Sequence, residues 1–283
     1  MSGILYLVGT PIGNLGDFSP RAVQTLEKVD FIAAEDTRVT LKLLNHFGVR
    51  KPMLSYFEHN RRERGEQIAA RLLTGESCAL VTDAGMPAVS DPGEDLVALC
   101  HERGIPVRAV PGPAAFVTAL ALSGLPVGRF TFEGFLSVNK RSRREHLASL
   151  AEERRTMVFY EAPHKLPATL RDLYQALGDR RIAIVRELTK VHEEVIRTTL
   201  EQAALEFADG GLRGEIVLVI EGAEKPAQDT VMLDEAVETA RGRMEGGQSA
   251  SDAARQTARE TGLKKGDIYK ALLEAPEDTD TNR

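Results

Sequence analysis

The chain has 283 residues, and its 36 basic and 42 acidic residues give a formal net charge of −6. Hydrophobic residues make up 42% and charged residues 28%, as in globular proteins, which excludes global disorder. The length predicts roughly two domains. Net acidity argues against a protein that holds nucleic acid by bulk charge alone, although a local basic patch would suffice. The low aromatic content, 5% with no Trp, argues against a base-stacking platform.

The two cysteines, Cys78 and Cys100, stand outside any C-x-x-C pair, which excludes a zinc ribbon or a disulfide framework and indicates reduced thiols in the cytosol. We therefore expect a cytoplasmic protein without a metal site. The apolar run at 4–8 is too short for a signal peptide. The uncharged stretch 109–128 is interrupted by proline and glycine, and its short apolar centre suits a buried helix better than a membrane span.

The first half of the chain alternates strand and helix patterns. Strands are expected at 4–8, 31–34, 53–57, 78–82 and 107–110, where short apolar runs end at loop residues. Helices are expected at 20–29 with Ser19 as N-cap, from Thr37 as N-cap to about residue 47, and at 63–73 and 94–103. This alternation predicts an α/β domain over residues 1–123 with a mainly parallel sheet.

Beyond Gly124 the strand candidates lie closer together, which predicts a second α/β domain over residues 124–224 with a mixed sheet. Its strands are expected at 130–132, 157–160, 182–187, 195–199 and 216–220, and its helices at about 141–153, 166–177 and 200–207.

Residues 225–283 are expected to form a linker and a helical tail. Helices are predicted around 233–244, at 249–261 and at 264–273, with Ser249 and Asp252 as a capping box and Gly262 as the turn. A helix, a glycine turn and a second helix outline a helix-turn-helix, and a helical cap on the second domain is an equal alternative. The acidic end, 275–283, is expected to be frayed.

Four strand ends of the first half carry loops rich in small residues and proline, at 9–14, 35–38, 83–93 and 111–115. In open α/β sheets, ligands bind beyond the carboxyl ends of the strands. Small residues and proline let the backbone approach a ligand closely and hold a rigid shape. Asp83, directly after a strand, suits a ligand with hydroxyls or a positive group. These loops predict a small-molecule site.

The same loops resemble those of the tetrapyrrole-methylase superfamily and, more narrowly, of its ribosomal branch, the small-subunit (16S) rRNA cytidine 2′-O-ribose methyltransferases. The motifs are LVGTPIGNL at 7–15, AEDTR at 34–38, TDAGMP at 82–87 with SDPG at 90–93, and PGP at 111–113. The second half agrees, with FEGFL at 132–136, FYEAPH at 159–164, RELTK at 186–190 with Glu193, and GE at 214–215.

The resemblance covers roughly residues 4–222 and implies two α/β domains of tetrapyrrole-methylase type, with S-adenosylmethionine (SAM) in the cleft between them. It implies methyl transfer to the ribose 2′-hydroxyl of a cytidine in the decoding region of 16S rRNA, within the 30S subunit, by a homodimer. By motif position, it implies the cofactor-binding residues Pro11, Thr82, Asp83, Ala84, Ala114, Ala115, Tyr160 and Glu161. Tetrapyrrole-binding relatives have Gly-Asp-Pro where this chain has Thr82-Asp83-Ala84, so the aspartate is kept and its neighbours differ.

Methyl transfer from a sulfonium requires alignment of nucleophile, methyl group and sulfur, and a 2′-hydroxyl also needs a base or a cationic stabiliser. The polar clusters at element ends offer Asp36, Lys190 and Glu193 as catalytic candidates, with Arg38 and His164 as further ones. Each has a plain alternative, such as a surface ion pair between Lys190 and Glu193.

Short basic runs predict contacts with RNA phosphates, because phosphate contacts set affinity and register. The RNA-binding candidates are Arg38, Arg61, Arg62, Lys140, Arg141, Arg143 and Arg144. A solvated helix face is the alternative for any one run. Two other functions stay open: methylation of a tetrapyrrole or other small molecule, which would need an apolar trough, and a non-enzymatic nucleic-acid-binding regulator led by the tail.

Overall fold

The computed structural model describes residues 2–224 and 227–274. The chain forms two compact units that divide after Ala223, and each is described by itself. The predicted frayed end at 275–283, and the centre of the predicted linker at 225–226, lie outside the described residues.

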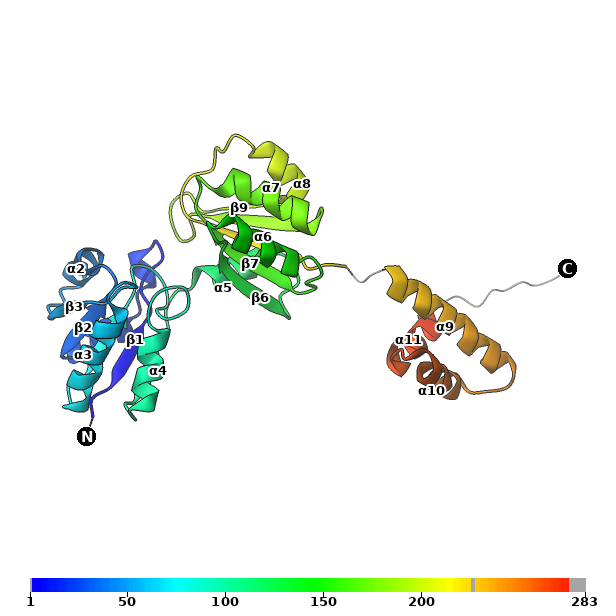
Figure 1. Ribbon diagram of the computed structural model, residues 1–283, viewed down its shortest axis with the longest axis horizontal. Helices are drawn as coiled ribbons and strands as arrows, with labels where there is room; N and C mark the ends of the chain where they lie inside the picture. The colour runs from blue at the N-terminus through cyan, green and yellow to red at the C-terminus, as the bar shows by residue number, and fades with distance from the viewer. Residues whose placement is uncertain (1, 225–226, 275–283) are drawn as a thin grey trace. The chain divides into compact units, whose positions relative to one another are not determined.

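The first unit contains two five-stranded sheets, and the first of them is entirely parallel (Figure 1). Its strand order is β3-β2-β4-β1-β5. The strands are β1 (Leu5–Val8), β2 (Phe31–Ala34), β3 (Met53–Ser55), β4 (Cys78–Val81) and β5 (Val107–Val110). The connecting helices are α1 (Pro20–Lys28), α2 (Thr37–His46), α3 (Arg61–Leu73) and α4 (Glu94–Glu102), with a 3₁₀ turn at Leu15–Asp17.

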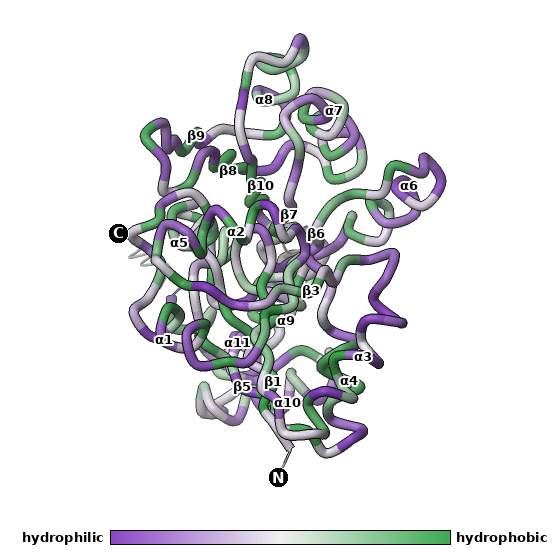
Figure 2. Tube along the Cα trace, turned by 90° about the vertical axis from the view of Figure 1, so that its left-hand side faces the viewer, coloured by the Kyte–Doolittle hydropathy of each residue, from purple (hydrophilic) through white to green (hydrophobic). Residues whose placement is uncertain are grey.

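The four helices cover both faces of this sheet. Side chains alternate along each strand, so Phe31 and Leu80 pack under α3 and α4, while Ile32 and Val81 pack under α1 and α2. Sequence predicted this parallel arrangement, and it brings the carboxyl ends of the strands to one edge. Figure 2 shows the tube at β1 and β10 in the green of hydrophobic residues and much of α6 in the purple of hydrophilic ones.

The second sheet is mixed, as predicted, with the order β6-β7-β10-β8-β9. Only β6 and β7 run parallel. Its strands are β6 (Phe130–Phe135), β7 (Thr156–Glu161), β8 (Arg181–Arg186), β9 (Glu194–Thr199) and β10 (Ile216–Ile220). Helices α6 (Lys140–Ser149), α7 (Leu166–Leu177) and α8 (Leu200–Glu206) pack on one face around Phe159 and Leu218.

Helix α5 (Ala115–Ser123) covers the opposite face of the second sheet, although it follows β5 of the first sheet directly. Its Ala119 and Leu120 pack against Val158, Val185 and Val217. The uncharged stretch thus holds a helix, as its length suggested, and one face of that helix is buried. The domain boundary expected after residue 123 stays a prediction, and the packing of α5 favours a passage between the two sheets nearer residues 111–114.

The helix ends follow capping chemistry. Ser19 caps α1 and Pro20 is its first residue, as predicted. The N-cap of α2 is Asp36 rather than the predicted Thr37, because the Asp36 carboxylate accepts a hydrogen bond of 2.8 Å from the Arg38 amide, and this leaves Thr37 as the first helical residue.

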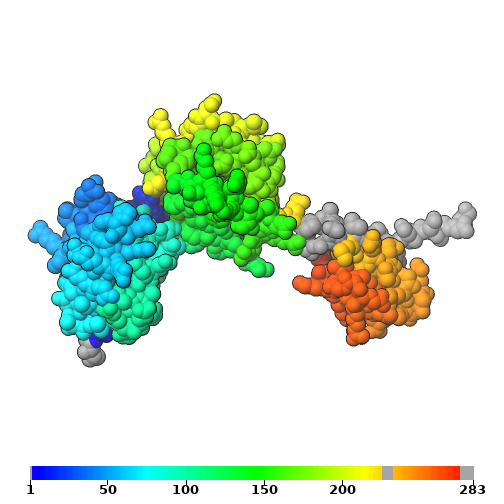
Figure 3. All heavy atoms as spheres, viewed as in Figure 1, coloured from blue at the N-terminus to red at the C-terminus, as the bar shows by residue number. Residues whose placement is uncertain are grey.

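The second unit contains α9 (Ala227–Glu245), α10 (Ala250–Thr261) and α11 (Lys265–Glu274). Its core is built mainly from alanines, with Ile268 fully buried, and the orange-to-red atoms of the three helices form one contiguous body in Figure 3. Ser249 caps α10, and Gly262 ends it in a left-handed conformation, as predicted. Across residues 2–224 and 227–274, no helix is long and apolar enough to cross a membrane.

Candidate functional site

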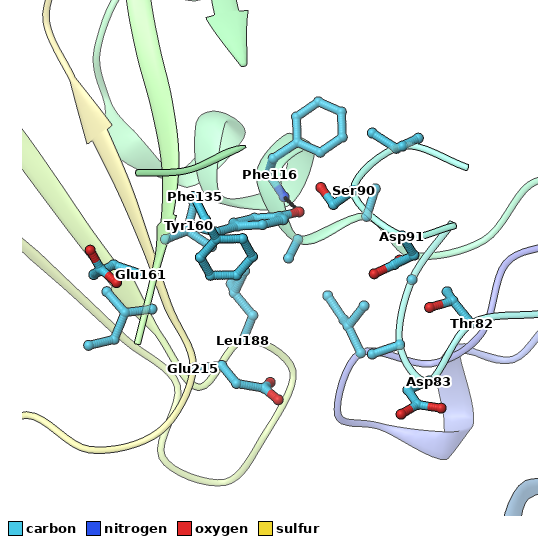
Figure 4. A pocket seen from close by; sticks show the side chains of 18 of the residues that line it. Thr82, Asp83, Ser90, Asp91, Phe116, Phe135, Tyr160, Glu161, Leu188 and Glu215 are labelled. Carbon is cyan, nitrogen blue, oxygen red and sulfur yellow. Dashed lines mark hydrogen bonds between the residues drawn. The ribbon is translucent and has the colours of Figure 1, made fainter. Parts of the chain in front are cut away.

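A pocket of about 440 Å³ lies in the first unit, where loops after β1, β4 and β5 face the end of β7 and the start of β10 (Figure 4). Its volume is in the range typical of small-molecule sites. In the view of Figure 4, Thr82, Asp83 and Asp91 form one wall, and Tyr160, Phe135 and Leu188 form the other. The carboxyl edge of the parallel sheet therefore carries the site that the strand-end loops predicted.

The polar wall is held by hydrogen bonds between loops. The Thr10 hydroxyl donates to the Thr82 carbonyl at 3.1 Å, and Thr10 also pairs with Gly85 through their backbones. The Glu35 carboxylate accepts from the Thr82 hydroxyl and, at 3.3 Å, from the Asp83 amide. Glu35 and Asp83 thereby share one side of the pocket.

Burial and the nearby Glu35 raise the pKa of Asp83. Asp91, on the same wall, also has a raised pKa, because burial and Glu35 outweigh the lowering effect of its hydrogen bond with Thr82. Two neighbouring carboxyl groups with raised pKa values in an open pocket indicate a place where a cationic or hydrogen-bonding group of a ligand would be favoured.

Two glycine contacts set the shape of the loops. A side chain on Gly112 would meet the backbone of Gly9 within 2.9 Å, so the loops after β1 and β5 touch through their backbones. Gly13, at the other end of the first loop, lies against Lys190, whose Cγ would be 2.7 Å from an added Cβ. The loop at 187–193 therefore packs directly on the loop at 9–14.

Tyr160 joins the second sheet to α5. Its hydroxyl accepts a hydrogen bond of 3.2 Å from the Phe116 amide, one of the amides that the first turn of α5 leaves without a helical partner. Its ring packs against Phe132 and Phe135, with centroids at 5.1 and 5.5 Å. The apolar wall is thus a cluster of aromatic rings that a hydrogen bond to Tyr160 connects to the first turn of α5.

Glu161 is 5% exposed, and its carboxylate points away from the polar wall in Figure 4. It accepts hydrogen bonds from the Thr169 hydroxyl and, at 2.8 Å, from the Ala162 amide. Arg143 of α6 donates to Thr169 at 2.9 Å and to Asp172 at 2.6 Å. A chain of polar contacts therefore runs from α6 to the pocket wall.

Seven of the eight cofactor-binding residues predicted from the sequence line the pocket, and Pro11 does not, although its neighbour Ile12 does. The seven are Thr82, Asp83, Ala84, Ala114, Ala115, Tyr160 and Glu161. Sequence reasoning did not assign several further lining residues, among them Glu35, Ser90, Asp91, Phe116, Phe135, Leu188 and Glu215. Most of these residues belong to the sequence motifs that carry the family resemblance. Carrying over more residues of those motifs would have predicted them.

The three catalytic candidates lie beside the pocket rather than on its lining. Asp36 forms a bidentate pair with Arg38, and this pair holds its pKa at about 2, below the ordinary 3.8. Lys190 bridges Glu187 at 2.9 Å and Glu215, a lining residue, at 3.1 Å. The Glu193 carboxylate accepts from the Thr189 amide at 2.7 Å, so it braces the loop rather than pairing with Lys190.

The RNA-binding candidates differ in exposure. Arg38 and Arg141 are 88% and 82% exposed, although each has an acidic partner, Asp36 and Glu145. Lys140 and Arg144 are exposed as well, but the Arg143 side chain is only 16% exposed and is paired with Asp172. The remaining two candidates, Arg61 and Arg62, are exposed at the start of α3.

Residues 4–204 match the family model of the tetrapyrrole (corrin/porphyrin) methylases. The chain belongs to this family. One solved tetrapyrrole methylase with this fold is the uroporphyrin-III C-methyltransferase from Thermus thermophilus, complexed with S-adenyl homocysteine. It superposes with a TM-score of 0.54 at 16% identity, over 77% of this chain and 97% of that one.

Several curated relatives carry the name ribosomal RNA small subunit methyltransferase I, among them proteins from Synechocystis and Halalkalibacterium halodurans. The protein from Synechocystis is 49% identical over 98% of this chain and 99% of its own length. The protein from Halalkalibacterium halodurans is 45% identical over 94% and 93%. These findings confirm the predicted superfamily with its ribosomal branch, the predicted fold class with two α/β domains of tetrapyrrole-methylase type, and the predicted enzyme class, a methyltransferase.

Proposed function

We propose that this chain transfers a methyl group from SAM to ribosomal RNA of the small subunit, at the ribose 2′-hydroxyl of a cytidine in the decoding region of 16S rRNA. The observation that carries the proposal is a two-walled pocket, built from the predicted motifs, in a chain 49% identical to a small-subunit rRNA methyltransferase I. The 2′-oxygen and the cytidine rest on the motif resemblance.

The residues that line the pocket fit the cofactor. SAM has an adenine ring, ribose hydroxyls and a cationic amino group, and the pocket offers the ring of Tyr160 with Leu188 on one wall and carboxyl groups on the other. Asp83 and Asp91 would face its polar groups, while Ala84, Ala114 and Ala115 leave room for its apolar parts. When bound, SAM supplies a methyl group on a positively charged sulfur.

The chain's own contribution is orientation and charge. The hydrogen bond between Tyr160 and Phe116, and the glycine contacts between loops, hold the walls rigid, which serves an in-line displacement. Burial lowers the pKa of Lys190, but its bonds to Glu187 and Glu215 raise it by more, so the amine stays protonated. Lys190 therefore acts as a cation that stabilises a developing alkoxide rather than as a base, and the proton of the 2′-hydroxyl leaves to solvent.

Exposed and buried side chains outside the pocket bear on the RNA substrate, the oligomeric state and the compartment. The exposed cations Lys140, Arg141 and Arg144 on α6 would contact phosphates of a folded RNA, which supports the 30S subunit as the substrate. The expected homodimer rests on the family resemblance, and the half-exposed Val117 on α5 and Val127 before β6 are candidates for its interface. The free, buried thiols of Cys78 and Cys100 are in keeping with the reducing cytoplasm.

A transfer assay with radiolabelled SAM tests the proposal, with naked 16S rRNA, unmethylated 30S subunits and a porphyrinogen as acceptors. We expect label in 30S subunits, and nuclease digestion should recover it as 2′-O-methylcytidine. Label in a base, or in the porphyrinogen alone, would overturn the assignment. Label in subunits but not in naked rRNA would show that the acceptor is a folded ribosomal surface.

A further inference from the structure

Phe135 is an aromatic residue of the pocket lining whose side chain is exposed to solvent. It is the last residue of β6, lines the pocket and is 62% exposed. Its ring lies 5.5 Å from that of Tyr160 with 58° between the planes, and Figure 4 shows the two rings side by side facing the space between the walls. Large aromatic side chains are normally buried, so an exposed ring in a ligand pocket indicates contact with a ligand.

A break in strand register places Phe135 there. Phe132 pairs with Val158, but Gly134 rather than Glu133 pairs with Phe159, and Phe135 pairs with Tyr160. Without the extra residue, Phe132 and Phe135 would point to opposite faces of the sheet. Gly134 adopts the left-handed φ of +63° that the irregularity uses. Bulges often re-aim a side chain beside a functional site, and this one adds a third ring to the wall.

The chain that follows Phe135 leads directly to the basic helix. Asn139 caps α6 by accepting from the amides of Arg141 and Ser142, and α6 begins at Lys140. The exposed cations of its first turns therefore lie a few residues beyond the ring. An aromatic ring next to cations is the combination that holds single-stranded nucleic acid, with the ring against a base and the cations against phosphates.

We infer that Phe135 stacks on the base of the nucleotide whose ribose enters the pocket. Drawing the ribose of one nucleotide into a pocket between two walls takes that nucleotide out of its stack, and an exposed ring beside the pocket replaces the lost stacking. One ring at the pocket mouth is also compatible with a chain poor in aromatic residues. The inference rests on the proposed function and adds a substrate contact to it.

Kinetics with unmethylated 30S subunits test the contact. Phe135→Ala should lower kcat/KM for the subunits by about 10-fold or more, the effect of losing one base–aromatic stack, and Phe135→Tyr should restore most of it. The affinity for S-adenosylhomocysteine, measured by calorimetry, should stay within about twofold of the unsubstituted protein. Leu205→Ala is the matched control, because Leu205 is 74% exposed on α8 and outside the pocket.

Fluorescence tests the stacking itself. The chain has no Trp, so Phe135→Trp introduces a sole tryptophan at the site and Leu205→Trp a sole tryptophan elsewhere. A decoding-region oligoribonucleotide should quench the first and not the second. The same oligonucleotide with an abasic ribose at the target position should quench much less.

Two results would overturn the inference: equal quenching by intact and abasic RNA, or a loss in Phe135→Ala that appears in S-adenosylhomocysteine binding rather than in the RNA step. The second result would assign the ring to the cofactor. Failure of the proposed function is distinguishable, because the unsubstituted protein would then transfer no label to 30S subunits.

Discussion

The guanidinium of Arg143 donates a hydrogen bond of 2.6 Å to the carboxylate of Asp172, one helix away on α7. The same guanidinium donates to Thr169, which in turn donates to the buried Glu161 on the pocket lining. This arrangement favours a positioning role for Arg143 over the RNA contact that its basic run predicts. Its neighbour Arg144 has an exposed side chain and keeps that prediction.

Separate substitutions of these two arginines should have different effects. Arg143→Ala should lower the free energy of unfolding by about 1–3 kcal/mol and weaken S-adenosylhomocysteine binding, because it leaves Asp172 and Thr169 without their donor. Arg144→Ala should leave both unchanged and reduce the salt slope of RNA binding by about 1. Urea unfolding, calorimetry and a salt titration measure the three quantities. A flattened salt slope in Arg143→Ala would contradict the assignment.

The difference between these arginines shows what the sequence could and could not predict. The parallel sheet and its loops were predictable, because strand length, caps and strand-end residues are local patterns. The partner of Arg143 is 29 residues away, and the register break that turns Phe135 depends on pairing with β7. The uncharged stretch predicted a buried helix at α5, but only the tertiary structure shows that this helix packs on the second sheet. Contacts between residues far apart in the sequence determine these three features, and the hydrophobic periodicity of a single segment does not reveal such contacts.

Asp36 should not supply the base of the reaction. Its pKa is lowered to about 2 by hydrogen bonds from Arg38, so at neutral pH it holds no proton and has little tendency to take one. A lowered pKa stabilises the fold above the ordinary value of 3.8, and this contribution is lost as the pH falls through about 2. Because the Asp36 carboxylate holds no proton at neutral pH, Asp36→Asn should leave the pH dependence of kcat/KM unchanged between about pH 5 and 9. Loss of an acid limb from that profile would restore Asp36 as the base.

Lys190→Ala should reduce the single-turnover rate by about 100-fold and S-adenosylhomocysteine affinity only slightly, because the amine would stabilise charge that develops during transfer. Lys190→Arg retains the charge and should recover part of the rate. Rapid-quench transfer to 30S subunits measures the step. If the alanine variant lost affinity and rate equally, Lys190 would be a structural tie between Glu187 and Glu215.

Asp91→Asn should stabilise the ligand-free protein at neutral pH. The raised pKa means that the fold favours the protonated carboxyl, so ionisation costs stability in full above the raised pKa. The cost declines as the pH falls through that pKa and is gone below the ordinary value of 3.8. The gain in Tm should be no more than about 2–4 °C at pH 7, because Asp91 is half-buried and solvent screens part of the repulsion, and it should vanish near pH 4. Scanning calorimetry at both pH values measures it. An equal gain at both would point to packing rather than charge.

Gly112→Ala should destabilise the first unit by about 1–3 kcal/mol, because the new methyl group would lie within 2.9 Å of the Gly9 backbone, which cannot move aside like a flexible side chain. Gly128→Ala is the matched control, since nothing lies within 4 Å of the position that its new methyl group would take. Urea titration compares the two. Equal midpoints would show that the two loops have room to separate.

The position of α5 also affects how the chain is made. The helix leaves the ribosome directly after the first sheet is complete, but the strands that bury Ala119 and Leu120 end only at Ile220. At about 5–20 residues per second, translation leaves its apolar face uncovered for roughly 5–20 seconds. During that interval the nascent protein displays a hydrophobic helix, a target for chaperones and a point where misfolding can start.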